Sequence, residues 1–319
     1  MNKFSQLKAG TFVSFLFLFM GCSATPQTIS VRQNPPQVNE SHQIGSVPFF
    51  PQKQFYCGPT TIAEIVSFYG KNTTPDDIAP MLFVPNKEGT FQIEMVASAR
   101  SHGLLAYQDR GTLELLLKLL DDNTPVIVFQ NLSIDWFPMW HYAVVKGYDL
   151  KEEKFYLHSG TIKNHETDFA TFERTWRRGN FWLLAPVPPD KISHHFSSFV
   201  VARSAQDLMS VGQTRAGLVA LETSTKVWPD YWLPYFLLGN YYLDKQVSTS
   251  IKWFELGLSY SLNQAPYLNN YAYALKDTKQ LDKALYYASK AKELAPDNQD
   301  ILDTHQSIKK LIKISNQEK

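Results

Sequence analysis

The sequence predicts two folded domains, an α+β domain followed by an all-α domain of helical repeats. The chain has 319 residues, which is about twice the usual length of one domain. Up to Pro186, helix-type apolar patterns come first and short β-branched and aromatic runs follow, as expected for helices and a mainly antiparallel sheet. From about residue 197 onward the apolar pattern is helical and repeats itself.

The composition excludes two broad classes of protein. The chain contains 31 basic and 30 acidic residues without a long run of one sign, so nothing favours binding to nucleic acid. Only two cysteines are present, Cys22 and Cys57, which excludes a disulfide framework. Each cysteine therefore needs an explanation of its own.

Residues 1–22 have the order of an export signal. Two lysines precede an apolar stretch over 12–20, which is shorter than the about 20 residues needed to span a bilayer. The segment Met20-Gly21-Cys22 resembles a bacterial lipobox, which implies a lipidated Cys22, a membrane partner and anchoring in the cell envelope. Ser23, rather than an aspartate, follows Cys22, which favours retention in the outer membrane, facing the periplasm, if the cell is Gram-negative. The alternatives, a plain secretory signal or an uncleaved anchor, also imply export.

The remaining segments are predicted in order along the chain. Residues 23–44 are polar and contain prolines, which predicts a flexible tether. The first domain is expected over 45–186, and prolines mark a linker over 187–196. Predicted helices follow Cys57 and lie near 91–101 and 112–121, and predicted strands cover 126–129, 142–148, 154–157 and 181–184.

The repeat domain is expected over 197–315. Its repeating positions are Tyr235, Leu238, Gly239, Tyr242, Phe254 and Gly257 in one unit and Leu268, Tyr271, Ala272, Leu275, Ala288 and Ala291 in the next. Residues 282–296 resemble the second half of a tetratricopeptide repeat, whose period is about 34 residues. The resemblance implies a solenoid whose groove binds a peptide or protein partner. The alternative is that the repeats only steady the first domain.

Cys57 is the first candidate for chemistry. It stands in Tyr56-Cys57-Gly58-Pro59 at a predicted helix start, where the helix dipole favours the nucleophilic thiolate. Gly58 allows a bound carbonyl to approach the backbone, and a backbone N–H with an upstream glutamine can hold an oxyanion. If Cys22 carries lipid, Cys57 is the only remaining thiol. The alternative is a small buried apolar residue.

His141 is the candidate base for this thiol. It begins the strand-like run His-Tyr-Ala-Val-Val-Lys-Gly-Tyr-Asp over 141–149, from which it can project toward a helix start. This run, together with Gln-x4-Cys-Gly-Pro, resembles the family of bacteriocin double-glycine leader peptidases, which is papain-like in fold. The resemblance covers about 45–186 and implies Cys57 as nucleophile, His141 as general base and acid, and Gln52 as oxyanion donor. Gln52 lies five residues before the cysteine, where six is usual in that family, so the assignment of the oxyanion donor is open and Gln54 is a rival.

The third member of the catalytic triad is altered. The family has an Asp or Asn, commonly followed by proline, where this chain has Leu157-His158-Ser159-Gly160. Asp149 lies eight residues along the strand, about 26 Å from His141 at about 3.3 Å per residue. A turn over 150–153 would bring Ser159 opposite His141, with His158 or Asn164 as alternates. A neutral serine stabilises an imidazolium less than a carboxylate does, which implies a slow or catalytically silent enzyme.

Two further groups of residues bear on binding. The segment 133–140 contains two tryptophans just before His141, and it either grips an extended peptide or packs on its own domain. Five histidines show no spacing typical of metal ligands, so no metal and no cofactor are expected: His102, His165, His194, His195 and His305.

Together these features predict an envelope-anchored cysteine peptidase that acts on peptides or proteins. Its expected mechanism uses a thiolate–imidazolium pair of Cys57 and His141, and its repeats bind partners or substrates. The main alternative is an impaired, peptidase-like scaffold that binds peptides or envelope proteins. A third possibility is amide hydrolysis on peptidoglycan stems.

Overall fold

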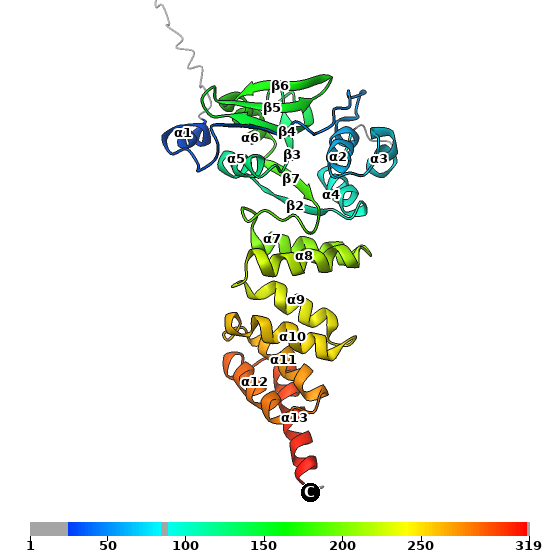
Figure 1. The fold of residues 1–319 in the computed structure, drawn as a ribbon, viewed down its shortest axis with the longest axis vertical. Coiled ribbons are helices and arrows are strands. Elements are labelled where there is room, and N and C mark those ends of the chain that lie inside the picture. The colour runs from blue at the N-terminus through cyan, green and yellow to red at the C-terminus, as the bar shows by residue number, and fades with distance from the viewer. Residues whose placement is uncertain (1–24, 84–88, 318–319) are drawn as a thin grey trace, which may run out of the picture.

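The structure is a computed structural model that describes residues 25–83 and 89–317. It contains an α+β domain followed by an elongated stack of helices (Figure 1). This confirms the predicted order of an α+β domain followed by an all-α repeat domain. The predicted signal peptide and Cys22 lie outside the described residues. None of the described helices is long and apolar enough to cross a bilayer.

The first domain is built on a seven-stranded antiparallel sheet with the order β2-β7-β3-β4-β5-β6, and β1 pairs with β4 beyond the end of β3. The strands are β1 (Ser41–Gln43), β2 (Leu105–Arg110), β3 (Val126–Asn131), β4 (Trp140–Asp149), β5 (Lys154–Ser159), β6 (Ile162–Asp168) and β7 (Trp182–Val187). β4 is buried from residue 142 to residue 148, so both faces of the sheet are covered there. Gly147 is needed in β4 because a Cβ at this position would lie 2.7 Å from the His42 carbonyl oxygen.

Two groups of helices flank the sheet (Figure 1). One group contains α2 (Cys57–Phe68), α3 (Pro75–Leu82) and α4 (Gln92–Ser101), and the other contains α1 (Pro26–Gln33), α5 (Leu113–Asp121) and α6 (Phe169–Arg178). Local sequence signals explain several of their starts. Thr74 and Asp77 form a reciprocal capping box at α3, and the Thr112 side chain accepts the Leu115 N–H at α5.

The prediction of a flexible tether over 23–44 is wrong for the described part of this segment. Residues 26–33 form α1, and the buried Glu173 carboxylate accepts the backbone N–H groups of Gln27 and Thr28 and the Thr28 hydroxyl. A carboxylate at a helix N-terminus is favoured because it pairs with free N–H groups and with the positive end of the dipole. The prediction failed because it used the local polar composition of this segment, which gives no sign of a partner about 145 residues away in the sequence.

The second domain consists of three helical hairpins and a final helix. The helices are α7 (Ser198–Ser210), α8 (Thr214–Val227), α9 (Trp232–Tyr242), α10 (Val247–Gly257), α11 (Ala265–Asp277), α12 (Leu281–Leu294) and α13 (Gln299–Gln317), with a short 3₁₀ helix η1 (Leu258–Tyr260) after α10. As the repeat pattern predicts, small residues lie where helices approach closely. A Cβ on Gly239 would lie 2.7 Å from the Phe254 ring, and one on Gly217 would lie 2.6 Å from the Ala205 carbonyl oxygen.

The two domains share packing at β2. Val201 and Leu208 of α7 belong to the same buried cluster as the sheet. Phe196 stacks on Tyr107 of β2 with ring centroids 4.0 Å apart, and the Ser204 hydroxyl donates to the Ala106 carbonyl. The segment between β7 and α7 is therefore packed against the first domain. This packing sets the orientation of the repeats relative to the first domain.

Candidate active site

Cys57 is the first residue of α2, as the sequence predicts. The Thr61 hydroxyl donates to the carbonyls of Cys57 and Gly58 in the first turn. Packing also requires a glycine at position 58. A Cβ there would lie 2.6 Å from Thr90 Oγ1, so the missing side chain makes room for Thr90.

The surroundings of the thiol favour its protonated form. Burial raises the pKa of Cys57, and hydrogen bonds from backbone N–H groups, among them those of Tyr142 and Gly58, oppose that rise. The Tyr142 contact places the sulfur beside the residue that follows His141. The described residues show no direct hydrogen bond between the sulfur and the His141 ring.

His141 lies near the start of β4 and contacts Ser159 at the end of β5. Its Nε2 is 3.0 Å from Ser159 Oγ. Burial, and then repulsion from His165, lower the pKa of His141 to about 4. Both shifts favour the neutral forms of the two groups. The physical reason is that both groups are partly withdrawn from water and that, among the described residues, no carboxylate forms a hydrogen bond or ion pair with the imidazole.

The alternates for the third position lie elsewhere. Asn164 Oδ1 accepts a hydrogen bond from the buried Lys146 ammonium, and Asp149 accepts the Glu152 N–H at the hairpin end. His158 is buried and faces Glu64 of α2. Among Ser159, Asn164, His158 and Asp149, Ser159 is the one within hydrogen-bond distance of the imidazole.

Cys57, His141 and Gln52 line one cavity of about 650 Å³. Its other lining residues are Lys53, Phe55, Gly89, Thr90, Phe91, Phe129, Pro138, Trp140 and Tyr142. Gln54, the rival of Gln52, is exposed and is not among them. Phe55 has a φ of 63°, a left-handed conformation that costs a bulky residue about 1–2 kcal/mol and that is often found at functional sites.

An aromatic cluster forms one wall of this cavity and continues onto the surface. The Phe129 and Trp140 rings are stacked with centroids 5.0 Å apart, and Tyr142 packs against Phe129. Farther along the 133–140 loop, the side chains of Trp136 and Phe137 are 84% and 74% exposed. The two tryptophans of the loop therefore have different environments. Trp140 packs on its own domain, and Trp136 lies in solvent.

The exposed loop is nevertheless held in a defined shape. The Asn131 side-chain oxygen accepts the backbone N–H groups of Ser133 and Met139, and the Leu132 N–H donates to the Met139 carbonyl. Large exposed apolar side chains on an ordered loop indicate a binding surface.

A buried ionisable pair beside the site was not predicted. Glu64 and His158 are each 1% exposed, with Oε2 and Nδ1 3.5 Å apart, and Glu64 Oε1 accepts the Phe50 N–H. Burial raises the pKa of Glu64, and the contact with His158 opposes that rise. The pair joins the helix that carries Cys57, the strand that carries Ser159 and the loop that carries Gln52. A glutamate on the apolar face of α2 was the only sequence signal for it.

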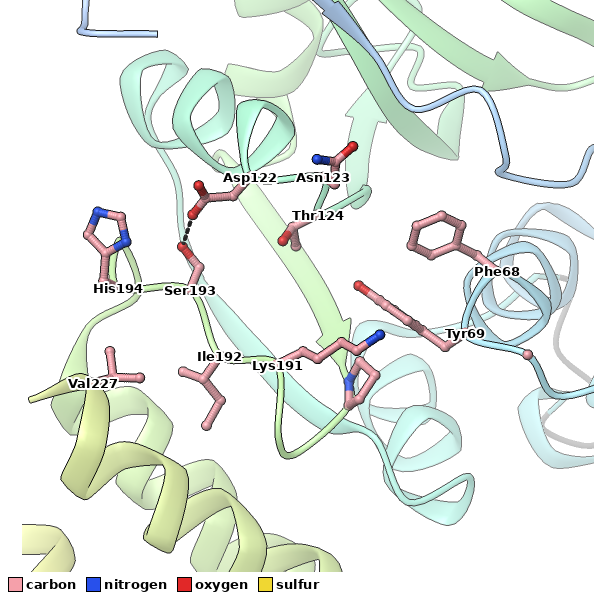
Figure 2. A pocket seen from close by; sticks show the side chains of 12 residues that line it. Phe68, Tyr69, Asp122, Asn123, Thr124, Lys191, Ile192, Ser193, His194 and Val227 are labelled. Atoms are coloured by element: carbon pink, nitrogen blue, oxygen red, sulfur yellow. Dashed lines mark hydrogen bonds between the residues drawn. The ribbon is translucent and has the colours of Figure 1, made fainter.

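A larger cavity, of about 770 Å³, lies at the other end of α2 (Figure 2). Phe68, Tyr69, Asp122 and His194 are among its lining residues, and Cys57 is not. Its chemistry is therefore separate from that of the thiol.

Comparisons with known proteins find one matching family model and several similar solved structures. Residues 44–181 match the model of the Peptidase_C39 like family. A C39-like peptidase from Bacillus anthracis is 17% identical, with a TM-score of 0.41 over 47% of this chain and 98% of that chain. A double glycine motif protease from an AMS/PCAT transporter, in complex with the leader peptide, is 21% identical, with a TM-score of 0.36 over 46% of this chain and 93% of that chain.

The first TPR domain of the human RPAP3 protein is 12% identical, with a TM-score of 0.36 over 40% of this chain and 100% of that chain. No curated protein sequence matches the chain significantly.

Proposed function

We propose that this chain, whose residues 44–181 match the model of the Peptidase_C39 like family, is a cysteine peptidase that uses Cys57 and His141. The observation that carries the proposal is the shared cavity. Cys57 at a helix start, His141 on β4 and Gln52 on the preceding loop come from separate segments and line one space. A nucleophile, a base and an oxyanion donor in one cleft are the parts that acyl transfer requires.

The neutral resting pair sets the proposed order of steps. With its proton on Nε2, the His141 ring donates to Ser159 Oγ, which leaves Nδ1 free to accept a proton. The thiol proton passes to Nδ1 as the sulfur attacks the peptide carbonyl. The imidazolium then gives this proton to the leaving amine, and water hydrolyses the thioester with the same base. Gln52 and the N-terminal N–H groups of α2 are the proposed donors to the oxyanion.

Ser159 makes this a slow peptidase in our proposal. Its hydroxyl can orient the imidazole but carries no charge to stabilise the imidazolium that forms during the reaction. The scaffold alternative has the same observation in its favour, since loss of the carboxylate is compatible with loss of catalysis.

We propose that the substrate is an extended peptide with large apolar side chains near the scissile bond. The stacked Phe129 and Trp140 rings line the cleft, and Trp136 and Phe137 extend the apolar surface away from it. The repeats are proposed to bind a protein or peptide partner, as helical solenoids do. Anchoring in the envelope through Cys22 is proposed from the lipobox-like segment of the sequence.

The test is labelling of Cys57 by an electrophilic peptide probe, followed by mass spectrometry of cleaved peptides. The protein should span residues 25–317, because a start at residue 45 would remove α1 and β1. A peptidase predicts labelling much faster than that of free cysteine, strong slowing by His141→Ala, and peptide cleavage that Cys57→Ala abolishes. Labelling at the rate of free cysteine would support the scaffold instead. Release of peptidoglycan stem fragments without peptide cleavage would support the amidase reading.

A further inference from the structure

We propose that Asp122, His194 and His195 form a Zn²⁺ site at the junction of the two domains. Asp122 ends α5, and the two histidines lie in the segment that joins β7 to α7. One potential ligand atom from each residue lies within 4.8 Å of the others. This is a site separate from the thiol cavity, and it does not depend on the proposed peptidase activity.

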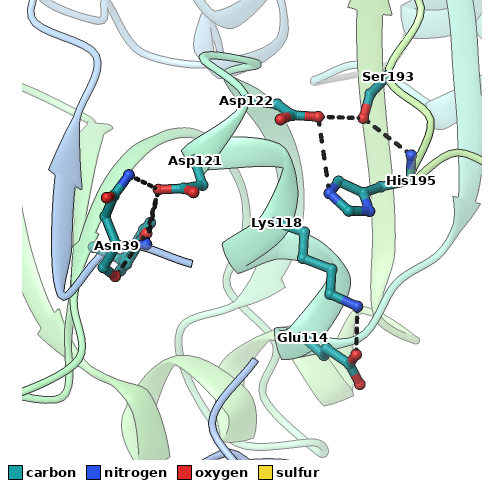
Figure 3. A network of polar contacts seen from close by, with 8 residues as sticks. Asn39, Glu114, Lys118, Asp121, Asp122, Ser193 and His195 are labelled. Carbon is teal, nitrogen blue, oxygen red and sulfur yellow. Dashed lines mark hydrogen bonds and ion pairs between the residues drawn. The ribbon is translucent and has the colours of Figure 1, made fainter. Parts of the chain in front are cut away.

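The carboxylate is already oriented toward the histidines. The Ser193 hydroxyl donates to Asp122 Oδ2, and the His195 backbone N–H donates to Ser193 Oγ (Figure 3). The same Oδ2 lies 4.0 Å from His195 Nε2. A hydrogen-bonded carboxylate beside two imidazoles has the arrangement that metal sites use to fix their ligands.

The position of Asp122 favours a bound cation. It is the C-cap of α5, where the helix dipole is negative and a second negative charge is unfavourable. The neighbouring Asp121 is compensated by hydrogen bonds from the Tyr148 hydroxyl and the Asn39 amide. Within the described part of the chain, no lysine or arginine forms an ion pair with Asp122, and the nearby Lys118 is paired with Glu114.

The donor set selects the kind of ion. Two imidazoles and one carboxylate suit Zn²⁺ and other late divalent metals and do not suit Mg²⁺ or Ca²⁺, which prefer oxygen ligands. Tetrahedral Zn²⁺ with bonds of about 2.0–2.1 Å needs ligand atoms about 3.3–3.4 Å apart. Asp122 and His194 are exposed, so side-chain rotations can draw the three groups together. The adjoining cavity gives access from solvent (Figure 2).

The consequence of binding is structural. The ion would tie the segment between the domains to the end of α5, next to the buried Ile192 and Phe196. A ligand that binds only the folded state stabilises it in proportion to the logarithm of its concentration over the dissociation constant. Zn²⁺ should therefore raise the melting temperature and hold the repeats more firmly against the first domain.

The experiment is calorimetric titration of the metal-free full chain with ZnCl₂. The chain carries Cys57→Ala so that the thiol and His141 cannot take the ion. We expect one Zn²⁺ per chain with a dissociation constant of about 10 µM or tighter. Asp122→Asn and His194→Ala should each weaken binding at least about tenfold, while the control His102→Ala leaves it unchanged. Asp122→Asn keeps the acceptor for Ser193, so the fold should survive.

The proposal fails if the chain shows no Zn²⁺ binding, or if Asp122→Asn and His194→Ala bind as tightly as the parent. It also fails if equimolar Mg²⁺ displaces the ion, because imidazole ligands would not permit that. The melting temperature gives a second readout. Zn²⁺ should raise it in the parent and not in His194→Ala, and an equal rise in both would contradict the site.

Discussion

The buried contact between Glu64 and His158 allows a sharp test of how the candidate active site is held together. We consider Glu64→Leu, which removes the carboxylate and keeps an apolar side chain of similar size. The change leaves the partly buried Phe50 N–H without its acceptor and takes the carboxylate away from the buried His158 ring, whose Nδ1 lies 3.5 Å from Glu64 Oε2. Losing a hydrogen-bond partner or a close polar contact costs about 1–3 kcal/mol for each group, so the sum is about 2–6 kcal/mol.

Replacing both partners should recover much of this loss. In Glu64→Leu/His158→Phe, an aromatic ring remains beside Phe49, whose ring centroid lies 5.1 Å from that of His158. Only the Phe50 N–H then stays unsatisfied, so we expect a loss of about 1–3 kcal/mol. The exposed pair of Glu114 and Lys118 provides the control, and Glu114→Gln should cost less than about 0.5 kcal/mol.

The assay is urea unfolding of residues 25–317 followed by tryptophan fluorescence. Free energies of unfolding are compared between variants whose m-values, the dependence of this free energy on urea concentration, are equal. Two results would refute the reasoning. One is a loss of unfolding free energy below about 1 kcal/mol for Glu64→Leu, because removing the partner of a buried polar group costs at least about that much. The other is a double variant as unstable as the single one, because the two residues would then not interact.

The remaining predictions concern the reaction. Ser159→Asp should speed labelling of the thiol by an electrophilic peptide by about tenfold or more, because a carboxylate stabilises the imidazolium, and an unchanged rate would show that Ser159 is not the partner. The pKa of about 4 for His141 keeps the base neutral at higher pH, so kcat/KM should persist well below pH 6.5 and fall only near pH 4; a fall near pH 6.5 would contradict it. Gln52→Ala should lower kcat about 100-fold and Gln54→Ala should not, as measured with one peptide substrate. Trp140→Ser should raise KM most for peptides with aromatic residues near the scissile bond; an equal effect on all peptides would count against the apolar subsite.

Local sequence signals were sufficient for several elements. The strands predicted over 126–129, 142–148 and 154–157 lie within β3, β4 and β5, because apolar runs of this length mark buried strands. α1 and β6 were missed for physical reasons. α1 depends on Glu173, which lies far along the chain, and β6 is a largely exposed strand of polar residues at the sheet edge. Elements that depend on tertiary partners carry little local signal.

Some features of the candidate site were likewise predictable from the sequence, and others were not. Hairpin register led to Ser159, although a bulge between Val145 and Gly147 shifts the pairing by one residue. The protonation states were not predictable, because they depend on burial that the sequence does not reveal. The meeting of Asp122 with two histidines from another segment was missed because spacing rules detect only ligands that are close in sequence.

The packing of α1 restricts how far the body can stand from a bilayer. If Cys22 is lipidated, two residues separate it from Thr25, the N-cap residue of α1, and the Cα atoms of Cys22 and Thr25 can lie no farther apart than about 11 Å. The first domain would then rest directly on the lipid headgroups, and the helical stack leaves this domain beside β2 (Figure 1). Such a molecule would meet its substrates within a thin layer at the membrane surface.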